Sequence, residues 1–159
     1  MSDKKTLIAY ATKSGVTGES ANIIAEVLRK KHGFSVDVIN LKEDAKPVLS
    51  QYDNIFIGSG IRMGRWYGKA KGLLKSNFEG KNVVIFLSAC SAGDPKSHDD
   101  AVAKYLDDVL AKYPSVKPVA TAAFGGRMKM FGKVKSDTCN PDKVRAWAEE
   151  VGKKLAAAK

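Results

Sequence analysis

The sequence contains little cysteine or histidine. Its 159 residues include two cysteines, Cys90 and Cys139, and two histidines, His32 and His98. No Cys-x-x-Cys pair occurs, so the spacing does not support a zinc or iron–sulfur site, and we expect no metal. We interpret Cys90 as a small residue at the end of a strand.

Long apolar runs are also missing. No segment approaches the roughly 20 apolar residues that cross a bilayer, so we expect no transmembrane segment. Residues 1–5 lead into a strand pattern and lack the apolar stretch of a secretory signal. We therefore expect a cytoplasmic protein, and a disulfide is disfavoured in that reducing compartment.

Acidic residues are scarce relative to basic ones. The chain has 27 basic and 17 acidic residues, which gives a formal net charge of +10. No nucleic-acid-reading motif accompanies this charge, so we expect no nucleic-acid partner. A positive surface attracts an acidic protein, an anionic substrate or the anionic face of a membrane, the last as a peripheral contact. The alternative is a lysine-rich surface that is simply solvated.

Strand and helix patterns alternate along the chain. Short apolar or alternating runs predict five strands, at residues 6–11, 34–39, 54–57, 83–88 and 118–124. Helical periodicity predicts a helix after the first strand, and Gly33 fits as its end. It predicts a second helix from near Arg65 to residue 74. Ser97 and Asp100 suggest a capping box before a third helix, and Asn140 suggests an N-cap before the last. Residues 125–139 read as a long loop without a period.

This order predicts one domain over residues 1–159. Alternating strands and helices form a parallel sheet with helices on both faces. Ligands of such sheets bind outside the carboxyl ends of the strands. The loops at residues 12–17, 58–66 and 89–95 follow those ends, so they are the places to seek a site.

The loop at residues 12–17 is suited to an anion. It joins a buried strand to a helix N-terminus, where free N–H groups and the helix dipole favour negative charge. Thr12, Ser14 and Thr17 add hydroxyl groups, and Gly15 allows close backbone approach. The loop lacks the glycine patterns of nucleoside-triphosphate and dinucleotide sites. The alternative is an ordinary turn with hydroxyl caps.

Residues 10–18, Tyr-Ala-Thr-Lys-Ser-Gly-Val-Thr-Gly, resemble the phosphate loop of flavodoxins, whose pattern is Thr-x-(Ser/Thr)-Gly-x-Thr. Residues 52–60 and 83–94 resemble the third and fourth flavodoxin strands with their loops. The resemblance implies a flavodoxin-like α/β fold, a doubly wound five-stranded parallel sheet of order 2-1-3-4-5. It also implies a redox protein that transfers electrons through non-covalently bound flavin mononucleotide (FMN).

The same resemblance implies which residues bind the cofactor. Those that hold the phosphate are Thr12, Lys13, Ser14, Gly15, Val16 and Thr17. Those that flank the flavin ring are Ser59, Gly60, Ile61, Arg62, Met63, Gly64, Ser88, Ala89, Cys90, Ser91, Ala92, Gly93 and Asp94. We expect no catalytic side chain, because the flavin carries the electrons.

The chain departs from familiar flavodoxins, which are acidic. Residues 89–94 contain no aromatic side chain to stack on the flavin. The candidates elsewhere are Met63, Trp66 and Tyr67, although Trp66 fits equally well as a core residue in the first turn of a helix.

Residues 60–66 and 124–131 resemble those of the flavodoxin-fold protoporphyrinogen dehydrogenases, which are basic and pass electrons to a quinone. If both segments converge at the flavin edge, the cations that would orient the propionates of a porphyrinogen are Arg62, Arg65, Arg127 and Lys129. The alternative is that loop 125–139 packs beside the sheet with its charges solvated. That loop is also short for a dedicated membrane-docking insert.

Three functions therefore remain open. The first is an FMN electron carrier that serves an acidic redox partner. The second is an FMN-dependent dehydrogenase acting on protoporphyrinogen or a quinone. The third is a binding module that has kept the fold and lost the flavin.

Overall fold

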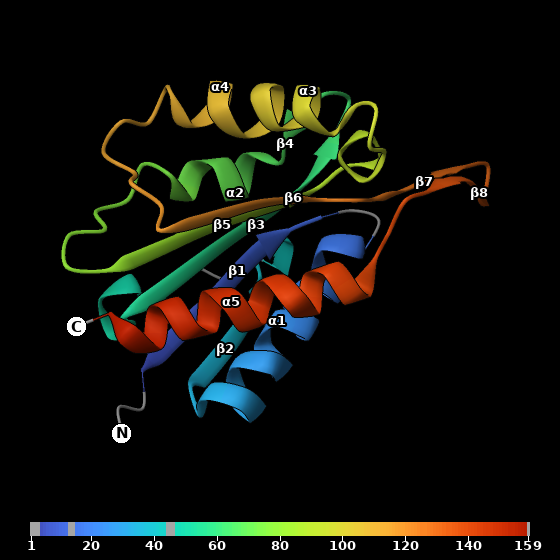
Figure 1. Cartoon of the computed structure of the whole chain (residues 1–159). Helices are drawn as coiled ribbons and strands as arrows, with labels where there is room; N and C mark the ends of the chain where they lie inside the picture. Colours follow the sequence, from blue (N-terminus) through green and yellow to red (C-terminus); the bar gives the residue numbers. More distant parts are fainter. Residues whose placement is uncertain (1–3, 13–14, 44–46, 159) are drawn as a thin grey trace.

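The protein has three layers, with a sheet between two layers of helices (Figure 1). The computed structural model describes residues 4–12, 15–43 and 47–158. The strands are β1 (Lys5–Ala11), β2 (Ser35–Asn40), β3 (Asn54–Arg62), β4 (Arg65–Trp66), β5 (Asn82–Ser88), β6 (Ala120–Phe124), β7 (Arg127–Met130) and β8 (Lys133–Asp137). The α-helices are α1 (Val16–His32), α2 (Gly68–Leu73), α3 (His98–Val102), α4 (Asp108–Leu110) and α5 (Pro141–Ala157). The 3-10 turns are η1 (Leu41–Glu43), η2 (Leu49–Gln51) and η3 (Cys90–Gly93), and a π-helical turn, η4 (Ala103–Asp107), joins α3 to α4.

The main sheet has the order β2-β1-β3-β5-β6, and these neighbours pair in parallel. When only the parallel strands are counted, this is the order 2-1-3-4-5. The doubly wound order that the resemblance implies is therefore confirmed. The edge strand β2 alternates at its start, with Val36 buried and Asp37 exposed, as expected for an edge with one wetter face. Short β4 adds an antiparallel pairing to β3.

Each face of the sheet has its own apolar core. Helices α1 and α5 cover one face, and α2 with the α3–η4–α4 segment covers the other (Figure 1). On the first face, a Cβ atom at Gly58 would lie 2.3 Å from the Phe86 ring, so only glycine lets the two strands pack there. Among the described residues, no helix combines the length and apolar character needed to cross a membrane.

The three helix boundaries predicted at Gly33, Ser97 and Asn140 are confirmed, but not every predicted capping bond is. Gly33 ends α1 with a φ of 68°, and Asn140 caps α5 by accepting a hydrogen bond from the Lys143 N–H. The capping box at Ser97 is wrong. Its hydroxyl instead donates to the carbonyl of Ser91 at 2.7 Å, which ties the start of α3 to the turn after β5.

The third strand is longer than predicted. It continues past residue 57 to Arg62, turns through Met63 and Gly64, and returns as β4. The following helix therefore starts at Gly68, and the prediction of a start near Arg65 is wrong. The glycines at 58 and 60 suggested a loop, but here glycine makes room within a strand for its neighbours.

The prediction of a loop over residues 125–139 is also wrong. Strands β7 and β8 form an antiparallel hairpin, closed by a two-residue turn at Phe131 and Gly132. The hairpin projects beyond the end of the main sheet (Figure 1). Strand β8 is mostly exposed. Because no core covers it, its sequence has no apolar alternation to reveal a strand.

Candidate functional site

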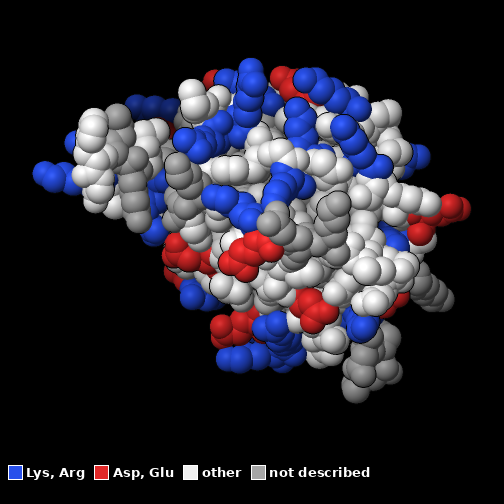
Figure 2. All heavy atoms as spheres, turned by 180° about the vertical axis from the view of Figure 1, so that it is seen from behind, with Lys and Arg blue, Asp and Glu red and all other residues white. Residues whose placement is uncertain are grey.

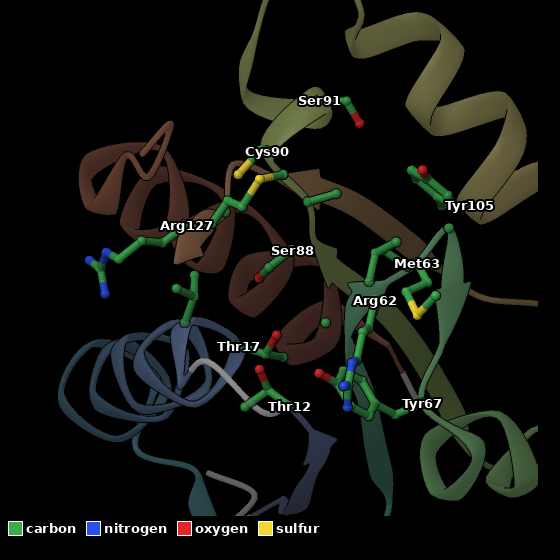
Figure 3. A pocket seen from close by; sticks show the side chains of 17 residues that line it. Thr12, Thr17, Arg62, Met63, Tyr67, Ser88, Cys90, Ser91, Tyr105 and Arg127 are labelled. Carbon is green, nitrogen blue, oxygen red and sulfur yellow. The ribbon is translucent and has the colours of Figure 1, made fainter. Parts of the chain in front are cut away.

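A cavity of about 750 Å³ lies at the carboxyl edge of the sheet (Figure 3). Its walls come from the start of α1, the β3–β4 hairpin, the end of β5, the turn η4 and the base of the β7–β8 hairpin. The residues that line it are Thr12, Val16, Thr17, Gly60, Ile61, Arg62, Met63, Gly64, Tyr67, Ser88, Ala89, Cys90, Ser91, Tyr105, Gly126, Arg127 and Met128. The three loops singled out from the sequence therefore meet at one cavity.

The start of α1 forms the polar end of this cavity. Gly15 caps the helix with a φ of 88°, a left-handed conformation that suits glycine. The first N–H groups of a helix have no partner inside it, so they attract an anion. Figure 3 shows Thr12 and Thr17 side by side at this end. Val16, also predicted to hold the phosphate, lines the cavity as well. Lys13 and Ser14 lie outside the described residues.

Gly60 keeps this polar end open. A Cβ atom at Gly60 would lie 3.1 Å from Thr12 Oγ1 and 3.4 Å from Thr17 Oγ1. It would also lie 3.2 Å from the Tyr67 ring. The two hydroxyl groups and the ring thus surround the space above Gly60, and a larger residue would fill it.

Two buried hydroxyl groups at the cavity have no hydrogen-bond partner in the part of the chain that the structure describes. Thr17 Oγ1 and Ser88 Oγ are both buried, and no described residue hydrogen-bonds to either. Burying an unpaired hydroxyl group costs about 1–3 kcal/mol by mutational data. Since both residues line the cavity, a polar ligand there would satisfy them.

The β3–β4 hairpin divides its residues between the cavity and the core. Ser59 does not line the cavity, because its hydroxyl donates to the Gly60 carbonyl at 2.7 Å and accepts from the Tyr67 N–H at 3.1 Å. Arg65 lies outside the lining as well. Trp66 is buried and its Nε1 donates to the Tyr105 carbonyl at 2.8 Å. Trp66 is therefore a core residue, as the alternative prediction stated, but it lies in strand β4 and not in a helix.

The loop after β5 is only partly at the cavity. Residues 88–91 line it, whereas Ala92, Gly93 and Asp94 do not. Ala92 is buried, and its carbonyl lies 2.6 Å from His98 Nδ1. Gly93 packs against Thr138, where a Cβ atom would lie 2.4 Å from the hydroxyl oxygen. These residues shape the turn behind the cavity wall.

Arg127 lines the cavity from the opposite hairpin, and its guanidinium points away from the other labelled side chains (Figure 3). Its guanidinium pairs with Glu19 of α1 at 3.2 Å and with Asp137 of β8 at 3.1 Å. The hydrogen bond that Arg127 Nε donates to the Asp137 carboxylate is the main cause that raises the pKa of Arg127. The arginine therefore fastens the hairpin to α1 beside the cavity. The side chain of Lys129 lies outside what the structure describes.

Two residues that line the cavity were not predicted from the sequence. Tyr105 lies in the π-helical turn η4 and lines the cavity. Such turns often occur at functional sites. Gly126 sits where the base of the hairpin meets the end of β5, and a Cβ atom there would lie 3.1 Å from the Cys90 backbone nitrogen. Only the fold brings these residues together.

Comparison with known proteins shows the family and the fold of this chain. The family model described as a flavodoxin domain matches residues 7–133. The oxidised flavodoxin 1 of Bacillus cereus is similar in fold, with a TM-score of 0.63, 20% identity and coverage of 94% of this chain and 97% of that one. A Streptococcus pneumoniae flavodoxin gives a TM-score of 0.60, 19% identity and coverage of 96% and 98%.

A curated relative is similar over most of this chain. It is the protein named protoporphyrinogen IX dehydrogenase [quinone] of Escherichia coli K12, with 27% identity over 135 residues. The match covers 85% of this chain and 65% of the relative.

Proposed function

We propose that this chain, which belongs to the flavodoxin domain family, is an FMN-binding redox protein whose FMN lies in the cavity at the carboxyl edge of the sheet. The volume of about 750 Å³ is within the usual range for small-molecule and cofactor sites. The buried, unpartnered hydroxyl group of Thr17 at the N-terminus of α1 is the observation that carries the proposal.

The polar end of the cavity fits the phosphate of FMN. Thr17 is one of two hydroxyl groups beside the space above Gly60, and the first turn of α1 supplies N–H groups. A phosphate is acceptor-rich and negatively charged, so it satisfies such donors together. Thr12, Gly15, Val16 and Thr17 would hold it, with Lys13 and Ser14 as further candidates from the sequence.

The rest of the cavity fits a flat ring system. Tyr67 and Tyr105 are the aromatic side chains that line it, and Tyr67 was one of the predicted stacking residues. Ile61 and Ala89 add apolar surface, while Ser88 offers its unpartnered hydroxyl group. When bound, FMN supplies the group that accepts and releases electrons. The protein's residues orient it and restrict water.

The charge of the chain narrows the choice of partner. Flavodoxins transfer electrons to redox partners, and a net charge of +10 favours partners with a negative surface. We assign no nucleic-acid partner, because the charge is spread over the whole chain.

A second candidate is a dehydrogenase that acts on an anionic substrate such as a porphyrinogen, with a quinone as acceptor. The relative's name suggests it, and Arg62 and Arg127 line the cavity from two different hairpins. Arg62 makes no ion pair with any described residue, whereas Arg127 already has two carboxylate partners. A substrate carboxylate would therefore meet Arg62 with less competition.

Turnover measurements separate the two candidates. The dehydrogenase proposal expects the Arg62→Ala/Arg127→Ala double variant to lose porphyrinogen oxidation while it keeps FMN. Arg145→Ala, which removes a surface cation from α5, is the matched control. Unchanged turnover in the double variant would rule out a propionate clamp.

The FMN site is tested by titrating flavin-free protein with FMN and following flavin fluorescence. Thr17→Val removes the hydroxyl group and keeps the shape. Because a hydrogen bond to a charged group contributes about 1.5–3 kcal/mol, we expect affinity to fall about 10- to 100-fold. The exposed Ser50→Ala is the control. A protein that binds no FMN, or a Thr17→Val variant with unchanged affinity, would refute the placement.

A further inference from the structure

Two hairpin turns of the protein share an unusual backbone. The β3–β4 turn consists of Met63 and Gly64, with φ values of 51° and 77°. The β7–β8 turn consists of Phe131 and Gly132, with φ values of 51° and 76°. Both are two-residue turns with two positive φ angles, as in type I′ turns.

The first residue of each turn is unsuited to its position. Type I′ turns favour asparagine, aspartate or glycine there, because a large side chain is strained at positive φ. Here the side chains are also solvent-exposed, with Met63 at 91% and Phe131 at 96%. Neither side chain offsets the strain by packing into a core. A strained and exposed apolar residue in two separate turns indicates a contact outside the chain.

Both hairpins border the same cavity, the β3–β4 hairpin with its turn and the β7–β8 hairpin with its base. Residues 61–64 line it from one hairpin and residues 126–128 line it from the other. Cations flank both tips, with Arg62 and Arg65 around Met63 and with exposed Lys133 and Lys135 after Phe131. Neither segment 61–66 nor segment 127–136 contains an acidic residue. Figure 2 shows the β7–β8 hairpin projecting at the left, with blue and white atoms at its end.

We propose that this face docks on an anionic lipid surface, with Phe131 and Met63 entering the apolar boundary of the bilayer. The flanking arginines and lysines contact lipid phosphates. Isolated apolar tips ringed by cations are typical of interfacial membrane binding, in which apolar burial and headgroup attraction act together. A protein partner would need a separate pocket for each tip, whereas a bilayer accepts both at any spacing. Docking of this kind does not depend on the proposed flavin site.

Vesicle sedimentation with the flavin-loaded protein tests the docking. We expect the protein to bind mixed phosphatidylglycerol–phosphatidylcholine vesicles and to bind pure phosphatidylcholine at least tenfold more weakly, because each cation near the surface adds attraction. Phe131→Asn suits positive φ and should weaken binding about tenfold, as expected for one lost apolar side chain. Val48→Asn is the matched control, because Val48 is 57% exposed and precedes the start of β3, away from the cavity.

Charge and depth are measured separately. Lys133→Gln should weaken binding, and exposed Lys153→Gln on α5 should not. The fluorescence of Phe131→Trp should be quenched by brominated lipids, whereas Val48→Trp, with the same background from Trp66 and Trp147, should stay unquenched. Flavin absorbance of each sample shows whether FMN is retained, so a failed flavin site is recognised independently.

Three results would overturn the proposal. The first is that the wild-type protein binds neither vesicle. The second is that Phe131→Asn binds as tightly as the wild type. The third is that the fluorescence of Phe131→Trp stays unquenched on vesicles that the protein binds. If Phe131→Asn slowed electron transfer to a partner protein and left vesicle binding unchanged, the tips would be a protein contact instead.

Discussion

Phe131 occupies a position at which a smaller residue would be more stable. Its φ of 51° places a bulky side chain in the left-handed region, which costs roughly 1–2 kcal/mol relative to an ordinary conformation. Asparagine tolerates this region. We predict that Phe131→Asn raises the free energy of unfolding by about 1 kcal/mol, as measured by urea denaturation.

The matched control is Val134→Asn on the same hairpin. Val134 is 53% exposed but lies in β8 with an ordinary strand backbone, so no gain is expected. A loss of stability in Phe131→Asn would mean that the phenylalanine packs against the protein.

Cys139 should be a slow nucleophile. Burial, followed by a hydrogen bond with Asp137, raises the pKa of its thiol from 9.0 to about 11. A raised pKa lowers the thiolate fraction at pH 8, so iodoacetamide should react about 100-fold more slowly than with an unperturbed thiol. Alkylation of a Cys90→Ala variant, which leaves Cys139 as the only thiol, measures this rate. A rate equal to that of a small free thiol would contradict the buried environment.

At the scale of elements, Thr138 joins the hairpin to the main sheet. Its hydroxyl donates to the Cys90 carbonyl at 2.9 Å and accepts from the Gly126 N–H at 3.1 Å. A Cβ atom at Gly125 would lie 1.8 Å from the Thr138 carbonyl oxygen, so the backbones meet closely here. The base of the hairpin, and with it the Arg127 side of the cavity, depends on this contact.

Thr138→Val should therefore loosen the hairpin. It leaves the Gly126 N–H without its side-chain acceptor, which costs about 1–3 kcal/mol. We predict a lower free energy of unfolding and faster hydrogen exchange in β7 and β8. Thr121→Val, on an exposed position of β6, is the control and should change neither. Unchanged exchange in Thr138→Val would show that other contacts hold the hairpin.

The sequence predicted those elements whose burial leaves a pattern. The apolar strands, the amphipathic helices and the loop at residues 12–17 follow from periodicity and helix-end chemistry, and their order is confirmed. The hairpin at 127–137 left no such pattern, because its strands have no core to face. Glycines 58 and 60 misled the prediction, since their role is to admit Phe86 and the cavity hydroxyls.

Only part of the cavity could be predicted, because some of its residues come together only through packing. Thr12 and Thr17 lie close in the sequence to the N-terminus of α1, so their role beside an anion could be predicted from helix-end chemistry. Tyr105 depends on a local π-helical turn, and Gly126 on the contact with β5, which periodicity does not encode. Side chains that come together only through packing have no local signal.

At the scale of the whole molecule, both cores pack on one sheet, and we propose a single functional domain for residues 1–159.

The net charge of +10 belongs to the chain as a whole. We predict that association with a negatively charged partner slows at least tenfold as ionic strength rises from low to physiological values. Stopped-flow measurement across a salt series checks this, and a rate that ignores salt would exclude electrostatic steering.

We propose that the start of α1, with Thr12 and Thr17, holds the phosphate of FMN. The most direct test is to titrate the flavin-free protein with FMN and with riboflavin, which has the same ring but no phosphate. We expect FMN to bind at least tenfold more tightly, because only its phosphate pairs with the helix N–H groups and Thr17. Equal affinities for the two flavins, or binding of neither, would contradict it.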